Sequence, residues 1–495
     1  MPPKIPRLLW LALPVAYLTY LFRITGIGLI GPDEPRYAAI ARGMARSGDW
    51  ITPRLWGQPW FEKPALLYWM SGAAFRLGLG PELAPRLPVA LLSIAFLAFF
   101  WWIVSREFGC RAASLATLIL GTSAAWIGFS QVGVTDLPLT ATFSAAMLLA
   151  LPWIAKRETR TLPAASAVLG LAVLAKGLLP LALAAPLALR IRWFRDLLRP
   201  TVLLPFFAVA LPWYVLCYLR NGTVFLHEFF LVHHLERFTQ TGLQHVQPWW
   251  FYVPRLPALL LPWTPLLLAL RPRADWAEPR RRFLLAWVAF GLLFFSASTN
   301  KLPGYLLPLL PPLAILMALG LEQVRRAGAL LVASALLLAA YSIAAPLLPA
   351  AVANLWAGAP RPSFHWTWLL PIIPAACAWI LEARAWRIAA LAAVAAAAAI
   401  ALAALKWTAG PAIDQTATAR GLARAIAGHP GAVCLESVRR DWQYGLNYYT
   451  GTRLPECASE AKPFHVTQQQ GFPPTLVPAI LEGGTTSPPR EVDRR

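Results

Sequence analysis

The stretch "LIGPDEPRYAAIARG", residues 29–43, ends an apolar run and passes directly into Asp33, Glu34 and Arg36, with prolines flanking the two acids. Ionisable residues are costly to place beside hydrocarbon, so charged residues at such a boundary indicate a function. We therefore expect residues 8–30 to span a membrane. The acids that follow should lie at the edge of an active site.

The composition of the whole chain supports this interpretation. Of its 495 residues, 58% are hydrophobic and 14% are charged, with a mean hydropathy of +0.54, whereas about a quarter of the residues in a soluble domain are charged. Apolar runs near the roughly 20 residues that cross a bilayer recur along the sequence, which predicts an all-α polytopic membrane protein. The thirteen expected spans are residues 8–30, 88–104, 112–130, 137–154, 161–175, 177–189, 201–219, 253–270, 283–297, 302–320, 328–348, 366–381 and 388–405.

The formal charge of +21 does not indicate a nucleic-acid partner, because the basic residues occur in short clusters between apolar runs. With the N-terminus inside, every cytoplasmic connection carries at least two Lys or Arg, as in "RIRWFRDLLRP", residues 190–200. The short outer connections carry at most one, which is the positive-inside pattern. This topology places the acids after the first span, and the C-terminus, on the outer face, the periplasm of a bacterium.

Three longer segments are expected outside the membrane. Residues 31–87 contain two stretches with the apolar spacing of interfacial helices, and residues 220–252 form a second loop. These two loops, residues 31–87 and 220–252, should form the rim of the active site. They would belong to a transmembrane domain over residues 1–405. Residues 406–495 change to mixed polar sequence, which predicts a small periplasmic α/β domain with a disordered tail.

The cysteines fit this topology. Cys217 and Cys377 fall in expected spans, and Cys110 lies on the cytoplasmic side, where disulfides are rare. Cys434 and Cys457 alone share the oxidising side. We therefore expect a disulfide between these two residues.

Two acids at the outer edge are candidates for catalysis. Asp33, held between prolines, suits a general base for an acceptor hydroxyl; the alternative is that Asp33 or Glu34 caps the following helix. Asp136 lies between two apolar runs with no basic neighbour. It is either a second functional acid or a buried structural carboxylate.

Several cations and donors could hold a phosphate. Lys63, beside Glu62, suits this role or is an interfacial lysine that reaches toward the headgroups. Arg237 could bind phosphate oxygens in a fork or belong to a solvated loop, and Lys301 and Tyr305 place two donors on one helical face. The chain has no P-loop or Rossmann glycine motif, so no nucleotide is expected and a lipid phosphate is favoured.

A metal is suggested by His233 or His234 together with Glu62. One histidine and one glutamate are a weak signal, because catalytic zinc usually has three or more protein ligands.

Several stretches resemble the bacterial aminoarabinose lipid A transferases, relatives of the protein O-mannosyltransferases within the C-type (GT-C) membrane glycosyltransferases. The stretches include "GPDEPRYAAIARGMARSGDWITPRLWGQPWFEKPALLYW" (31–69), "SQVGVTDLPL" (130–139), "VHHLERFT" (232–239) and "STNKLPGYLLPLLPPLAILMA" (298–318). They lie in order within residues 1–325. The resemblance implies a GT-C-like fold, a polyprenyl-phosphate sugar donor, an acceptor at the periplasmic face and transfer with inversion.

The resemblance also assigns roles to residues. It implies that Asp33 is the catalytic carboxylate and Asp136 a second essential acid, and that Glu62 ligates a metal, zinc in some relatives, with a histidine of the 227–239 loop. The family pattern HEHxxRF has Val232 at its first histidine here. The residues expected to bind the donor phosphate are Lys63, Arg237, Tyr305, Lys301 and Arg36.

The acceptor is expected to be lipid A or another glycolipid. The alternatives are a protein Ser or Thr, as for the mannosyltransferases, or a hopanoid. A different class, a transporter or flippase for a lipid-linked sugar, would place ionisable residues through the midplane in two repeated halves. Here they cluster at one face, and no repeat is visible.

Overall fold

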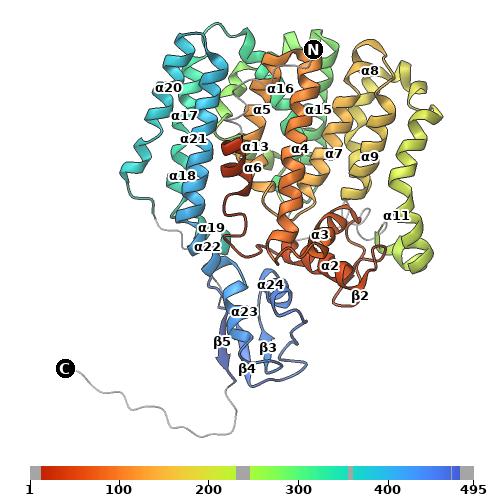
Figure 1. Ribbon diagram of the computed structural model, residues 1–495, viewed down its shortest axis with the longest axis vertical. Helices are drawn as coiled ribbons and strands as arrows, with labels where there is room; N and C mark the ends of the chain where they lie inside the picture. Colours follow the sequence, from red (N-terminus) through yellow and green to blue (C-terminus); the bar gives the residue numbers. More distant parts are fainter. Residues whose placement is uncertain (1–12, 230–245, 355–360, 470, 480–495) are drawn as a thin grey trace.

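The computed structural model describes residues 13–229, 246–354, 361–469 and 471–479. A bundle of helices forms most of the molecule, and a small domain extends from one end of it (Figure 1). Within the described ranges, six helical segments are long and apolar enough to cross a membrane, and three apolar helices are shorter. The polytopic all-α architecture is therefore confirmed.

The six long segments are α4 (Leu83–Phe108), α7 with α8 (Asp136–Leu149, Leu151–Lys156), α11 (Pro200–Leu226), η6 with α16 (Pro303–Leu309, Leu310–Gln323), η7 with α20 (Trp366–Leu369, Ile372–Ala383) and α21 (Arg387–Thr408). The shorter helices are α5 (Cys110–Gly121), α9 (Leu162–Lys176) and α17 with α18 (Gly328–Leu336, Ala339–Ala344). Other elements of the bundle are α6 (Ala124–Phe129), η4 (Trp249–Phe251), α14 (Pro272–Ala277), α15 (Pro279–Ala297) and α19 (Leu348–Asn354).

Several of the expected spans are interrupted rather than continuous, among them the sixth and the eighth. Residues 177–189 and 253–270 each break into short helical pieces, because proline removes a backbone donor and clashes with the preceding turn. The pieces are α10 (Leu179–Leu183) and η2 (Ala185–Asp196) in the first, and α13 (Tyr252–Leu259) and η5 (Thr264–Ala269) in the second.

The first expected span ends earlier than the apolar run predicts. Its described helical part closes with the π-helix η1 (Tyr17–Leu21), and residues 22–30 have no helical structure. The guanidinium of Arg86 donates to the backbone oxygens of Ile24, Ile27 and Gly28 at 2.8–2.9 Å. These bonds replace the helical ones, so apolar residues continue into a segment that is not a helix.

The two helices expected after this segment are confirmed. They are α2 (Asp33–Ser47) and α3 (Leu66–Arg76), and they pack on each other at the same end of the bundle as the small domain (Figure 1). A short antiparallel hairpin, β1 (Arg54–Leu55) and β2 (Gln58–Pro59), lies between them in the sequence. The turn between α20 and α21 lies at the opposite end of the bundle.

The C-terminal domain (residues 410–479) has the expected mixture of helix and sheet. Strand β3 (Val433–Glu436) runs parallel to β4 (Phe464–Thr467), which pairs antiparallel with β5 (Thr475–Pro478). Its helices are α22 (Gly410–Ala417), α23 (Arg420–Ile426) and α24 (Arg440–Thr450). The expected disulfide between Cys434 and Cys457 is present, with the Cα atoms 5.0 Å apart. The expected disordered tail lies outside the described residues.

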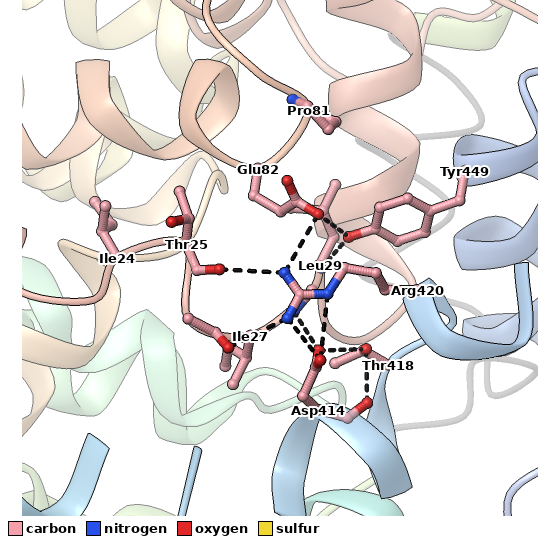
Figure 2. A network of polar contacts seen from close by, with 12 residues as sticks. Ile24, Thr25, Ile27, Leu29, Pro81, Glu82, Asp414, Thr418, Arg420 and Tyr449 are labelled. Atoms are coloured by element: carbon pink, nitrogen blue, oxygen red, sulfur yellow. Dashed lines mark hydrogen bonds and ion pairs between the residues drawn. The ribbon is translucent and has the colours of Figure 1, made fainter. Parts of the chain in front are cut away.

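A polar joint attaches this domain to residues 24–30 (Figure 2). Arg420 pairs with Asp414 at 2.6 Å and donates to the backbone oxygens of Thr25 and Gly26, each at 3.2 Å. Asp414 accepts from the backbone N–H of Gly28 at 2.7 Å. A Cβ on Gly28 would lie 2.8 Å from the Thr418 hydroxyl, so glycine is needed for these two segments of the chain to approach this closely.

Candidate active site

The start of α2 is fixed by a buried ion pair rather than by a helix cap. Neither Asp33 nor Glu34 makes a side-chain capping bond, so the capping interpretation is wrong. Instead both oxygens of Glu34 accept from Arg86, at 2.7 and 2.8 Å, in the forked geometry that suits this pair. Glu34 also accepts from the backbone N–H groups of Ile30 and Gly133. This network holds residues 30–34 and so sets the position of Asp33.

Asp33 stands at the exposed end of a chain of charges. Its Oδ1 lies 2.5 Å from Nη2 of Arg36, which in turn lies 3.0 Å from Oε2 of Glu62. The other oxygen of Glu62 lies 3.2 Å from Nζ of Lys63. The side chains of Arg36, Glu62 and Lys63 are 6–11% exposed, whereas that of Asp33 is 48% exposed. Four of the sequence candidates therefore lie together, with a carboxylate facing outward.

The same cluster contains donors that no described residue satisfies. These are Nε of Arg36, the indole N–H of Trp60 and the phenol of Tyr68, all three buried. Burial raises the pKa of Tyr68, and the charge of Glu62 adds to this effect, so the phenol stays protonated. Buried donors are normally paired, so the cluster is suited to receive an oxygen-rich group.

Asp136 and Tyr305 meet at a second cation. Nζ of Lys176 lies 2.8 Å from Oδ1 of Asp136 and 5.1 Å from the centre of the Tyr305 ring. Helix α9, which ends at Lys176, also packs on α3, the helix that begins shortly after Lys63. Asp136 is thus paired with a lysine 40 residues away rather than unpaired. The two candidate acids belong to neighbouring parts of one charged region.

Lys301 has different surroundings from those the sequence suggests. Its ammonium donates to the backbone oxygens of Gln247, at 3.0 Å, and Ser298. Burial lowers the pKa of Lys301. These bonds tie two chain segments together and use two of the three donors of the ammonium. His233, His234 and Arg237 lie outside the described residues.

The described residues do not form a metal site at Glu62. Its two oxygens face the cations Arg36 and Lys63, and no acid or histidine within the described ranges forms a ligand group with it. In the described ranges, the one close group of such ligands is Cys434, Cys457 and His465. Its two sulfurs are bonded to each other and so are not thiolate ligands.

Two residues of this region give no local signal in the sequence. Arg86 lies just before the second expected span, residues 88–104, and its partner Glu34 is 52 residues away. Tyr444, from α24, lies with its ring 5.4 Å from the Arg36 guanidinium. Both contacts join segments that are far apart in the sequence, so neither could be predicted from a local pattern.

Comparison with known proteins gives the family. The sequence profile described as Dolichyl-phosphate-mannose-protein mannosyltransferase matches residues 62–216. The undecaprenyl phosphate-alpha-4-amino-4-deoxy-L-arabinose arabinosyl transferase of Erwinia tasmaniensis is 31% identical over 406 residues, which cover 76% of this chain and 72% of that protein. The chain belongs to this arabinosyl transferase family.

Other relatives match over a shorter length. Arabinosyl transferase 1 of Sodalis glossinidius is 37% identical over 329 residues, 63% of this chain and 58% of the relative's length. The chain thus matches less than two thirds of that protein. ArnT from Cupriavidus metallidurans, solved bound to undecaprenyl phosphate, has 25% identity and a TM-score of 0.75, covering 94% of this chain and 87% of that one. The GT-C fold of the arabinosyl transferase family is therefore confirmed for this chain.

Proposed function

We propose that the protein transfers a sugar from undecaprenyl phosphate to an acceptor at the outer face of the bacterial inner membrane. The names of its relatives make 4-amino-4-deoxy-L-arabinose the favoured sugar, and lipid A or a similar glycolipid the favoured acceptor. The observation that carries the proposal is the cluster of Asp33, Arg36, Glu62 and Lys63, in which an outward carboxylate adjoins buried cations. Cations and an acid are the two components that this reaction needs.

The orientation is proposed from the distribution of charge. The basic connection after α20 lies at the end of the bundle opposite α2, α3 and the C-terminal domain (Figure 1). By the positive-inside rule, the first end is cytoplasmic and the second periplasmic. Residues 1–405 would then form the transferase domain and residues 406–495 a periplasmic domain.

The proposed chemistry is a single displacement at the anomeric carbon. The acceptor oxygen attacks this carbon and gives its proton to Asp33, while the bond to the phosphate oxygen breaks and its electron pair leaves with undecaprenyl phosphate. Lys63 and Arg36, together with Arg237 as the sequence suggests, would stabilise the charge that develops on the departing phosphate. The Asp136–Lys176 pair would hold the donor beside Asp33.

The first test is Asp33→Asn in purified full-length protein, supplied with undecaprenyl-phosphate aminoarabinose and lipid A. We expect the variant to bind undecaprenyl phosphate normally and to lose transfer by about 10²-fold or more, as for removal of a positioned general base. Product is measured by mass spectrometry, with a Ser/Thr-containing peptide as the alternative acceptor.

The matched control is Asp441→Asn, which removes a carboxylate paired with Arg439 at 2.7 Å in the C-terminal domain. It should leave transfer unchanged. Near-normal turnover by Asp33→Asn would remove Asp33 from the base role. Transfer to the peptide rather than to lipid A would replace the proposed acceptor.

A further inference from the structure

A cavity of about 320 Å³ lies between the β1–β2 hairpin and the C-terminal domain. Its size is at the lower end of the range for small-ligand sites. The side chains that concern the argument are Trp56, Arg440, Gln443, Tyr444, Asn447 and Arg453. This cavity is distinct from the Asp33 cluster but adjoins it.

The lining suits an anionic sugar. Neither Arg440 nor Arg453 forms an ion pair within the described part of the chain, and Glu456 is the one acid that lines the cavity, so the charge there is positive. The carboxamide of Asn447 uses its oxygen for the Leu454 N–H, which leaves its two N–H donors for the cavity. Guanidinium groups bind phosphate oxygens, and amides bind hydroxyls.

Trp56 reaches the cavity in a strained conformation. Its φ is 50°, and Gly57 follows at 85°, so both central residues of the hairpin turn have positive φ. Asn-Gly is the usual choice for such a turn, and a bulky residue at the first position is strained. The indole stacks on the Tyr444 ring, with centroids 5.5 Å apart and planes 15° apart. Strain of this kind is typical of functional positions, and the partly buried indole lines the cavity, where an aromatic ring can pack against a sugar.

Tyr444 links the cavity to the proposed reaction centre. Its ring lies 5.4 Å from the guanidinium of Arg36, and Arg36 contacts Asp33 at 2.5 Å. One aromatic ring and one arginine therefore separate the cavity from the proposed base. A larger acceptor that places one sugar in the cavity could therefore extend its next group toward Asp33.

We propose that this cavity binds the phosphorylated sugar headgroup of the acceptor. This inference rests on the proposed function, because the ligand is the acceptor of the proposed transfer. Binding of the ligand can nevertheless be measured without the transfer reaction. Arg453 and Arg440 hold the phosphate, Asn447 and Gln443 the hydroxyls, and Trp56 packs against the ring. The C-terminal domain is then part of the acceptor site.

Binding is measured by calorimetry on the full-length protein in detergent. The probes are glucosamine 1-phosphate, uncharged glucosamine, and diphosphoryl lipid A in mixed micelles. Wild type should bind the phosphorylated probes at least about tenfold more tightly than glucosamine, and Arg453→Gln should remove about tenfold of that affinity. Arg424→Gln, an exposed arginine of the same domain with no ion pair to a described residue, is the control and should change nothing.

A second variant separates binding from folding. Trp56→Asn gives the turn the residue that it prefers and removes only the aromatic surface, so the protein should stay folded and bind both phosphorylated probes more weakly. In transfer assays both variants should raise the acceptor KM and leave kcat and the donor KM unchanged.

The outcomes are distinct from those of the transfer test. Binding that depends on Arg453, in a protein that transfers nothing to lipid A, would support this site and contradict the proposed function. Binding of lipid A alone would restrict the ligand to the lipid-linked form. If neither phosphorylated probe binds, or if Arg453→Gln and Trp56→Asn bind as wild type does, the proposed site is wrong.

Discussion

At the scale of single residues, the buried pair of Arg86 and Glu34 holds the segment that leads to Asp33, the proposed base. Arg86 is 1% exposed and Glu34 is fully buried. Together they satisfy three backbone oxygens and two backbone N–H groups around the segment that leads to Asp33. The sequence indicates that Asp33 and Glu34 are important but not how they differ, because adjacent acids have the same local pattern. Burial separates their roles.

Replacing Arg86 should therefore be severe. Arg86→Met leaves the Glu34 carboxylate buried without its cation, which costs about 3–5 kcal/mol in comparable pairs. We expect the melting temperature of the detergent-purified protein to fall markedly, measured by tryptophan fluorescence. Arg106→Met, at an exposed arginine of the same helix, should melt as wild type does. Equal melting of the two variants would contradict the role assigned to the pair.

At the scale of elements, the sequence predicts helices better than it predicts where they stop. The apolar spacing of residues 34–48 and 63–78 correctly gives α2 and α3, since half-buried helices leave a regular pattern. The same apolar content fails for residues 22–30, because hydropathy does not record which group satisfies the backbone. Here a distant guanidinium does so, and the segment need not be a helix.

The disulfide is an element-scale prediction from topology, and it has a measurable role. It joins β3 to the segment that carries Arg453 and Glu456, beside the backbone bonds between Leu435 and residues 455 and 457. Replacing Cys434 and Cys457 by serine should reduce the unfolding free energy of this domain by about 3 kcal/mol. Hydrogen exchange over β3 reports the change.

The exposed free cysteine Cys110 provides the control for that experiment. Cys110→Ser should leave hydrogen exchange over β3 as it is in wild type. Exchange in the double variant that matches Cys110→Ser would mean that the bridge adds nothing to the stability of the domain.

At the scale of the whole molecule, the C-terminal domain is joined to the membrane part through α2 and residues 24–30 (Figure 2). The sequence predicts a small α/β domain on the outer side, but it does not predict where that domain docks. Docking depends on contacts between residues hundreds of positions apart, such as Arg36 with Tyr444. The cavity at this contact is invisible in the sequence for the same reason.

The joint should be sensitive to acid. Burial opposes the charge of Asp414, but bonds from Arg420, the Gly28 N–H and Thr418 outweigh it and lower its pKa. A carboxyl whose pKa is lower in the folded protein stabilises it fully above the unfolded value, near 4, and loses this effect as the pH falls through the folded value. The gap in melting temperature between wild type and Asp414→Asn should stay constant above about pH 5 and narrow below about pH 4. A gap independent of pH would contradict this assignment.

The guanidinium groups of Arg86 and Arg420 both bind backbone carbonyls of residues 24–30. The contact of Arg420 with Thr25 joins residues 395 positions apart in the sequence. During synthesis, the segment between the first membrane helix and Asp33 can therefore complete its contacts only after Arg420 has been made. A chain whose synthesis stops before Arg420 would have inserted membrane helices but would lack the contacts that hold residues 24–30. Incomplete chains of the protein should therefore lack the proposed transfer activity.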